Sequence, residues 1–147
     1  ADKEELIEKA ELDLRKGENS MIPQKILLII DDEEALTSML SFRLKSMGFD
    51  TVTANDGEKG IELAKKNKPD LILLDLMMPT VDGFEVSKRL KKDSDTRHIP
   101  IVVFSALVNN NTKESIAELG AAGFIEKPFE PEDLIMKIEK ELEVKNG

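Results

Sequence analysis

The chain of 147 residues contains no cysteine, tryptophan or tyrosine. Without cysteine it has neither a disulfide framework nor a thiolate metal site, which is compatible with a reducing cytoplasm. The longest uninterrupted apolar run is Ile26–Ile30, far short of the roughly 20 residues that cross a membrane as a helix. The acidic start of the chain also lacks the apolar core of a signal peptide. We therefore expect a cytoplasmic protein without a membrane segment.

An excess of basic residues is missing as well. Lysine and arginine number 21 against 30 aspartate and glutamate residues, which gives a formal net charge of −9. Direct binding to nucleic acid is not expected, because the basic residues are scattered among acids and form no patch to neutralise phosphates. The contents of 40% apolar and 35% charged residues are typical of a soluble globular protein of one domain.

Residues 2–16 are expected to form a helix apart from the rest of the chain. Its narrow apolar stripe has helical spacing and consists of Leu6, Ile7, Ala10 and Leu14. The polar residues 18–23 follow, so we place a boundary between an N-terminal helix and linker at 1–22 and a domain at 23–147. The helix is either a linker from a preceding domain or a docking or dimerising element, which leaves a homodimer open. The first residue is not methionine, so it was removed or the chain is a piece of a longer one.

Strand and helix signals alternate from Lys25 onward. Strands are expected at Ile26–Ile30, Thr51–Ala54, Leu71–Asp75, Ile101–Ser105 and Gly123–Glu126. Helices are expected at Glu34–Met47, Asp56–Lys66, Gly83–Lys91, Thr112–Leu119 and Pro131–Glu143. Five such units predict an α/β fold with a parallel sheet, helices on both faces and right-handed crossovers. Helix ends are indicated by capping-box spacing at Asn55 with Glu58 and Asn111 with Glu114, by Gly48, and by Pro131.

Three of the expected strands lead into ionisable residues. The first is followed by Asp31 and Asp32, the third ends in Asp75, and the last is followed by Lys127. The carboxyl ends of parallel strands meet at one edge of a sheet, where ligands bind. If these strands are neighbours, three carboxylates and one ammonium group converge. Such a cluster is costly unless a cation and an exchangeable anion complete it, which indicates a magnesium-dependent acceptor of a phosphoryl group.

Residues 25–145 resemble the receiver domain of a two-component response regulator, of the flavodoxin-like, CheY-type fold. The resemblance rests on the order of five markers: the pair Asp31-Asp32, Asp75, the loop Met78–Gly83, Ser105-Ala106, and Lys127-Pro128. It implies a doubly wound five-stranded sheet with the strand order 2-1-3-4-5, to which the N-terminal helix is an addition.

The resemblance also implies roles for the residues at the strand ends. Asp75 is the expected phosphoacceptor, because a carboxylate oxygen can attack phosphorus to give a mixed anhydride. Mg²⁺, for which Mn²⁺ is a substitute, is expected to be held directly by Asp32, Asp75 and the carbonyl of Met77, and by Asp31 through water. Lys127 supplies a fixed positive charge and then pairs with the phosphoryl oxygens.

The other markers are implied to bind phosphate or to transmit the signal. The Ser105 hydroxyl and the Ala106 backbone N–H are expected to bind phosphoryl oxygens. Phe124 occupies the aromatic switch position that acts together with Ser105, although a core role is an equal alternative. The peptide bond before Pro128 resembles the cis bond of the family, which is accessible because the following residue is proline.

Two apolar residues lie where the family controls the access of water. Met77 and Leu107 stand two positions beyond Asp75 and Ser105, which predicts slow hydrolysis of the phosphoryl group. His98, the only histidine, is expected to be exposed rather than catalytic, so the donor histidine comes from another protein.

The sequence therefore predicts a phosphorylation-controlled switch whose donor is a sensor histidine kinase or a histidine phosphotransfer protein. It is a signalling domain rather than an enzyme, although it promotes its own phosphorylation and dephosphorylation. The output surface implied by the family is the fourth helix, fifth strand and fifth helix, at about 111–144, which contacts a downstream protein. A phosphorylation-independent adaptor is the first alternative. A metal-dependent phosphatase is the second, but the second acid that such enzymes carry two residues after the nucleophile is absent, since Met77 stands there.

Overall fold

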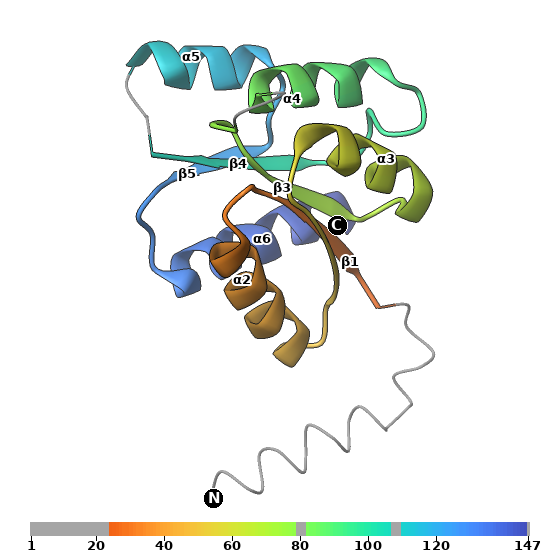
Figure 1. Cartoon of the computed structure of the whole chain (residues 1–147), viewed down its shortest axis with the longest axis vertical. Helices are drawn as coiled ribbons and strands as arrows, with labels where there is room; N and C mark the ends of the chain where they lie inside the picture. Colours follow the sequence, from red (N-terminus) through yellow and green to blue (C-terminus); the bar gives the residue numbers. More distant parts are fainter. Residues whose placement is uncertain (1–23, 79–81, 107–109, 147) are drawn as a thin grey trace, which may run out of the picture.

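A computed structural model of the chain describes residues 24–78, 82–106 and 110–146. Five strands alternate with five helices in this part of the chain (Figure 1). The strands are β1 (Ile26–Ile30), β2 (Asp50–Ala54), β3 (Leu71–Asp75), β4 (Ile101–Ser105) and β5 (Gly123–Glu126). The helices are α2 (Glu34–Ser46), α3 (Gly57–Asn67), α4 (Gly83–Lys92), α5 (Asn110–Glu118) and α6 (Pro131–Asn146). The expected helix at 2–16 and the boundary after residue 22 lie outside the described residues.

The strands form one parallel sheet in the order β2-β1-β3-β4-β5, which confirms the expected topology. Helices α3, α4 and α5 cover one face of this sheet, and α2 and α6 cover the other (Figure 1). The strand order reverses between β1 and β3, which lie side by side. In doubly wound folds, ligands bind at the carboxyl edge of the sheet at such a switch point.

Two apolar clusters, one on each face, hold the helices against the sheet. Alternate residues of the strands contribute to each cluster, since successive side chains of a strand point to opposite faces. Every residue of β3 and β4 is buried. A strand covered on both faces must be apolar at every position, which is why Leu71–Leu74 has no polar alternation. Asp75 and Ser105, the last residues of β3 and β4, are the exceptions, and both are buried as well.

The strand boundaries agree with the sequence except that β2 begins one residue earlier, at Asp50. The prediction that Asn55 caps the second helix is wrong. Asp56 caps α3 instead, because its carboxylate accepts a hydrogen bond of 2.8 Å from the Lys59 backbone N–H. Asn111 is likewise not a cap, since α5 begins at Asn110.

Other predicted helix ends are confirmed. Pro131 is the first residue of α6, where its missing N–H costs no helical hydrogen bond. Gly48 follows α2 with φ at +99°, a conformation that favours glycine. Asp82 caps α4 through a hydrogen bond of 3.0 Å from the Glu85 backbone N–H.

Gly83 brings the start of α4 into contact with the end of β3. A Cβ atom built on this residue lies 2.5 Å from the carbonyl oxygen of Asp75 and still closer to the Cα of Leu76. The Gly83 backbone N–H also donates a 3.0 Å hydrogen bond to the Leu76 carbonyl. The Asp75 carbonyl oxygen and the Leu76 Cα are backbone atoms, which cannot move aside as a flexible side chain can. A side chain at residue 83 therefore has no room.

We expect Gly83→Ala to destabilise the fold by about 1–3 kcal/mol or more, because the added methyl group forces apart two backbone segments. Urea unfolding followed by circular dichroism measures the loss. Gly123→Ala is the matched control, since its added Cβ meets nothing nearer than 3.5 Å and should be tolerated. Equal stability of the two variants would contradict the close contact between α4 and β3.

Candidate functional site

Three aspartates lie at the carboxyl edge of the sheet where β1 and β3 adjoin. Asp31 and Asp75 are buried, whereas Asp32 is exposed. One carboxylate oxygen from each of the three residues lies within 4.8 Å of the other two. The structure therefore brings together the three acids that the sequence predicts to bind a metal.

Backbone hydrogen bonds fix the two buried carboxylates. Asp31 Oδ1 accepts a 2.9 Å hydrogen bond from the Glu33 N–H, and Asp75 Oδ1 accepts one of 3.1 Å from the Met77 N–H. The Asp31 backbone N–H in turn donates to the Ala54 carbonyl at 3.1 Å. These bonds hold oxygen atoms, the ligands that Mg²⁺ prefers, around one point, so the donor set fits this ion.

Lys127, in the loop after β5, points its ammonium group into this cluster. Its Nζ atom lies 3.1 Å from Asp31 Oδ2 and 3.5 Å from Asp75 Oδ2. The same atom lies 3.3 Å from Glu33 Oε1 and 4.9 Å from the centre of the Phe104 ring. Burial lowers the pKa of Lys127, but the negative charges of Asp75 and Asp31 outweigh this effect and raise it. The amine therefore stays protonated and offers a fixed positive charge.

The pKa of Asp75 is raised to about 6. Burial is the main cause, since it penalises the ionised carboxylate, and the charge of Asp31 adds to it. The hydrogen bond from Met77 and the charge of Lys127 act in the opposite direction. At neutral pH the carboxylate is mostly ionised, yet it remains in an environment that opposes its charge.

The remaining predicted residues surround the cluster at the same edge of the sheet. Ser105 ends β4, next to β3, and is buried, whereas Ala106 after it is exposed. Met77 is 50% exposed. The peptide bond between Lys127 and Pro128 is cis, as expected, and the Lys127 backbone N–H donates to the Ser105 carbonyl at 2.8 Å.

The sequence also made predictions for Phe124, His98 and Leu107. Phe124 is half-buried and packs against the core, while Lys113 Nζ of α5 lies 5.8 Å from the centre of its ring. His98 is exposed, as expected. Leu107 lies outside the described residues.

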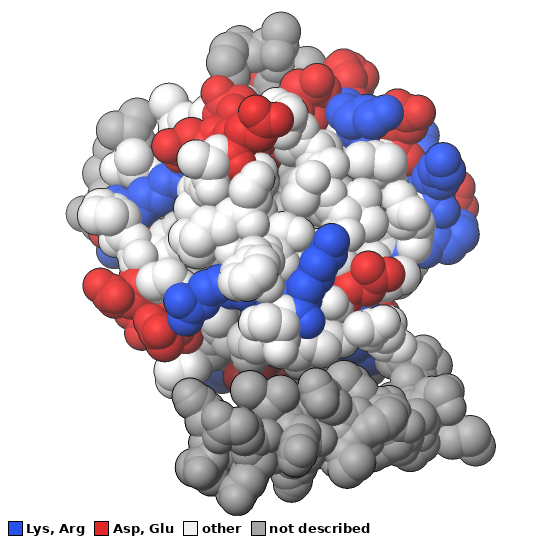
Figure 2. Space-filling view, turned by 60° about the horizontal axis from the view of Figure 1, so that its bottom comes forward, with Lys and Arg blue, Asp and Glu red and all other residues white. Residues whose placement is uncertain are grey.

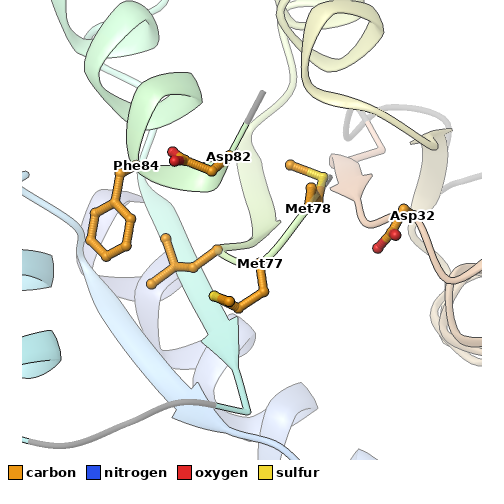
Figure 3. A pocket seen from close by; sticks show the side chains of 6 residues that line it. Asp32, Met77, Met78, Asp82 and Phe84 are labelled. Carbon is orange, nitrogen blue, oxygen red and sulfur yellow. The ribbon is translucent and has the colours of Figure 1, made fainter. Parts of the chain in front are cut away.

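An open pocket of about 500 Å³ adjoins the acidic cluster, lined by Asp32, Leu76, Met77, Met78, Asp82 and Phe84. In Figure 3, Asp82 and Phe84 border one side of this pocket and Asp32 the other, with Met77 and Met78 between them. The exposed side of the site is therefore largely apolar beside a charged centre.

Sequence reasoning missed Glu33 and Phe104 as neighbours of Lys127. Glu33 carried a signal, since it extends the acidic run of Asp31 and Asp32 by one residue. Phe104 carried none, because an apolar residue inside a buried strand is explained by the core alone.

Lysine and arginine side chains form no continuous basic area on the face shown in Figure 2, where much of the surface is uncharged. Across the described ranges, every helix is too short or too polar to span a bilayer.

Comparison with known proteins identifies the family. A family model described as the response regulator receiver domain matches residues 27–139. The DNA-binding dual master transcriptional regulator RpaA of Synechocystis is 41% identical over 112 residues, which are 76% of this chain and 46% of that protein. The regulatory protein PhoP of Bacillus subtilis, which controls alkaline phosphatase synthesis, is 38% identical over 114 residues, or 78% of this chain and 47% of that protein. The chain thus spans about half the length of these curated relatives.

Solved structures of response regulators are also similar to this chain. The chemotaxis protein CheY4 of Vibrio cholerae superposes with a TM-score of 0.77 at 30% identity, covering 80% of this chain and 98% of that one. A response regulator from Chloroflexus aurantiacus gives 0.76 at 31% identity, with 82% and 98% covered.

Receiver domains are signalling domains of two-component systems. They interact with histidine kinases and bind Mg²⁺ at a cluster of acidic residues, and the three aspartates gathered here form such a cluster. The fold, the strand order and the match over residues 27–139 lead to one conclusion: the chain belongs to the response regulator receiver domain family.

Proposed function

We propose that this domain is a phosphorylation-activated switch whose acceptor is Asp75. The observation that carries the proposal is the position of a buried carboxylate 3.5 Å from the Lys127 ammonium group and within a cluster of three aspartates. Phosphoryl transfer depends mainly on positioning and on neutralisation of charge, and this cluster supplies both.

The donor is a phosphohistidine of a sensor kinase or of a histidine phosphotransfer protein. A carboxylate oxygen of Asp75 attacks the phosphorus atom, the bond between phosphorus and the imidazole nitrogen breaks, and that nitrogen keeps the electron pair and takes up a proton. Lys127 already faces Asp75 Oδ2 and pairs with the oxygens of the transferred group. The Ser105 hydroxyl and the Ala106 N–H, at the end of the adjoining strand, donate further hydrogen bonds to these oxygens.

The metal proposed for this site is Mg²⁺, with Mn²⁺ as a substitute. Asp32, Asp75 and the Met77 carbonyl would hold it directly, and Asp31 would hold it through water. When bound, the ion supplies positive charge that offsets the repulsion among the carboxylates and the phosphoryl oxygens.

Helix α2 offers a contact surface for the donor protein. It begins three residues after Asp31, and three of the five large apolar side chains that are exposed in the described residues belong to it or to its C-terminal cap: Met39, Phe42 and Met47. Phe42 is 74% exposed. Exposed apolar residues gathered on one element are typical of interaction sites.

The output is proposed to pass through α5, β5 and α6 to a downstream protein. The added charge at Asp75 draws in Ser105 and Lys127. The Phe124 side chain on β5 then shifts from one of two positions toward the other. Phe124 is half-buried and has no hydroxyl group to anchor it, so both positions are accessible at small cost.

Incubation with acetyl phosphate and Mg²⁺ should add one phosphoryl group to the chain, because the acceptor and its charge partners are already in place. Intact-mass measurement detects the adduct, which should need Mg²⁺ and should be missing in Asp75→Asn. Asp70→Asn changes an aspartate that precedes β3, at the opposite end of the strand from Asp75, and is the control that should still be modified. Modification of Asp75→Asn to the wild-type level would refute Asp75 as the acceptor, and metal binding without any adduct would favour the adaptor.

Without metal, Asp75→Asn should be more stable than the wild type by roughly 1–3 kcal/mol at pH 7.5. The folded pKa of Asp75 is raised from 3.8 to about 6, so the folded state favours the protonated acid. The penalty for ionising Asp75 in the folded state is absent below about pH 4, grows as the pH rises toward the folded pKa of about 6, and is constant above it. Urea unfolding in EDTA between pH 4 and 8 measures the difference.

Addition of Mg²⁺ should then stabilise the wild type and leave Asp75→Asn nearly unchanged, since a ligand stabilises only the state that binds it. A difference between the two proteins that stays constant with pH would contradict the buried, raised acid.

The phosphorylated form should last far longer than seconds at neutral pH. Met77, beside Asp75, is apolar and only half-exposed, and it offers no group that orients an attacking water. The loss of the phosphoryl adduct, followed by mass after removal of the donor, gives the lifetime. Met77→Gln, which places an amide at that position, should shorten it, and a lifetime of seconds for the wild type would refute the prediction.

A further inference from the structure

The Lys127 ammonium group has more acidic partners than the acceptor site requires. An ammonium group carries three N–H donors, and three carboxylates lie around this one: Asp31 at 3.1 Å, Glu33 at 3.3 Å and Asp75 at 3.5 Å. Asp75 itself carries the phosphoryl group once it is modified, so phosphoryl oxygens that pair with Lys127 compete with Asp31 and Glu33, the two residues that accept hydrogen bonds from the ammonium group.

Asp31 cannot leave, because its side chain is 0% exposed and accepts a hydrogen bond from the Glu33 backbone N–H. Glu33, in contrast, has a side chain that is 64% exposed. Its carboxylate can move into water at little cost, because exposed ion pairs contribute little to stability.

Glu33 is a poor residue for its local position. It is the N-cap residue of α2, a position that favours serine, threonine, aspartate or asparagine. Its side chain makes no capping hydrogen bond and instead reaches Lys127. A residue that breaks a local rule but contacts a functional cluster is typical of a functional constraint.

We propose that Glu33 is a positioning residue that holds Lys127 in the unphosphorylated state and is displaced by the phosphoryl group. This inference rests on the proposed function. The Glu33 carboxylate occupies one donor of the ammonium group until a phosphoryl oxygen replaces it, and its charge opposes the approach of an anionic donor. Glu33 therefore lowers the affinity of the site for phosphoryl groups and favours the inactive state.

The opposite role makes the opposite prediction. If Glu33 served to orient Lys127 toward the phosphoryl group, its removal would weaken the binding of a phosphoryl mimic. Tighter binding of the mimic after removal of Glu33 would identify it as a competitor for Lys127, and weaker binding would identify it as a residue that orients Lys127.

The test compares Glu33→Gln and Glu33→Ala with the wild type. Beryllium fluoride, which mimics a phosphoryl group on a carboxylate, is titrated at saturating Mg²⁺, so that a change in metal affinity does not enter. Calorimetry serves as the readout because the chain has no tryptophan or tyrosine for fluorescence. We expect both variants to bind the mimic more tightly by about two- to fivefold, the range for an exposed ion pair, and to be modified faster by acetyl phosphate.

Glu34→Gln is the matched control, since it removes the same charge one residue further along, in the first turn of α2, where no described contact joins it to Lys127. It should leave the affinity for the mimic nearly unchanged. The melting temperature of Glu33→Gln should stay close to that of the wild type, because no capping bond is lost and the ion pair that is lost is an exposed one.

An affinity of both Glu33 variants equal to that of Glu34→Gln, or weaker than that of the wild type, would overturn the inference while the proposed function stands. A wild type that neither binds the mimic nor accepts a phosphoryl group would overturn both.

Discussion

The structure of the site depends on the Lys127 ammonium group at the edge of a sheet that buries two carboxylates. Asp31 and Asp75 could not both remain ionised there without a partner, because like charges in a poorly solvated place repel strongly. Lys127 lies within 3.5 Å of both, so it compensates part of this cost. The compensation is incomplete, since burial above all, together with the charge of Asp31, keeps the pKa of Asp75 raised. A divalent cation of the kind that receiver domains bind at their acidic cluster would offset this remaining cost.

The fold creates this arrangement through the order of its strands. Because β1 and β3 are neighbours while their connections leave in opposite directions, the residues after both strands face the same open edge. The apolar strands cannot shift along one another without burying polar groups, which fixes the register of the acids. Gly83 adds a second constraint, since α4 touches the backbone at Asp75 and Leu76, so the start of α4 packs directly against the end of β3 at Asp75.

Much of this could be predicted from the sequence. The strands were marked by continuous apolar runs, and their charged ends identified Asp31, Asp75 and Lys127 as one cluster once the strands were taken to be parallel. The local details were harder. The sequence predicted Asn55 as the cap of α3, whereas the structure has Asp56. Both adjacent residues suit that role, and only the path of the backbone selects one of them. The contact of Glu33 with Lys127 joins residues 94 positions apart, and its side chain could equally have pointed to solvent.

The partners of Lys127 differ in how freely they can be exchanged, and this difference bears on how a switch can work. Two buried carboxylates define where the ammonium group sits, whereas an exposed one can leave at small cost. A site with only fixed partners would hold Lys127 in one state, and a site with only exposed partners would not position it at all. A two-state equilibrium that a single added group can shift requires free energies of a few kcal/mol between the states. The exchange of one exposed carboxylate for a phosphoryl oxygen, at an ammonium group that stays in place, supplies only part of this free energy, because exposed ion pairs contribute little.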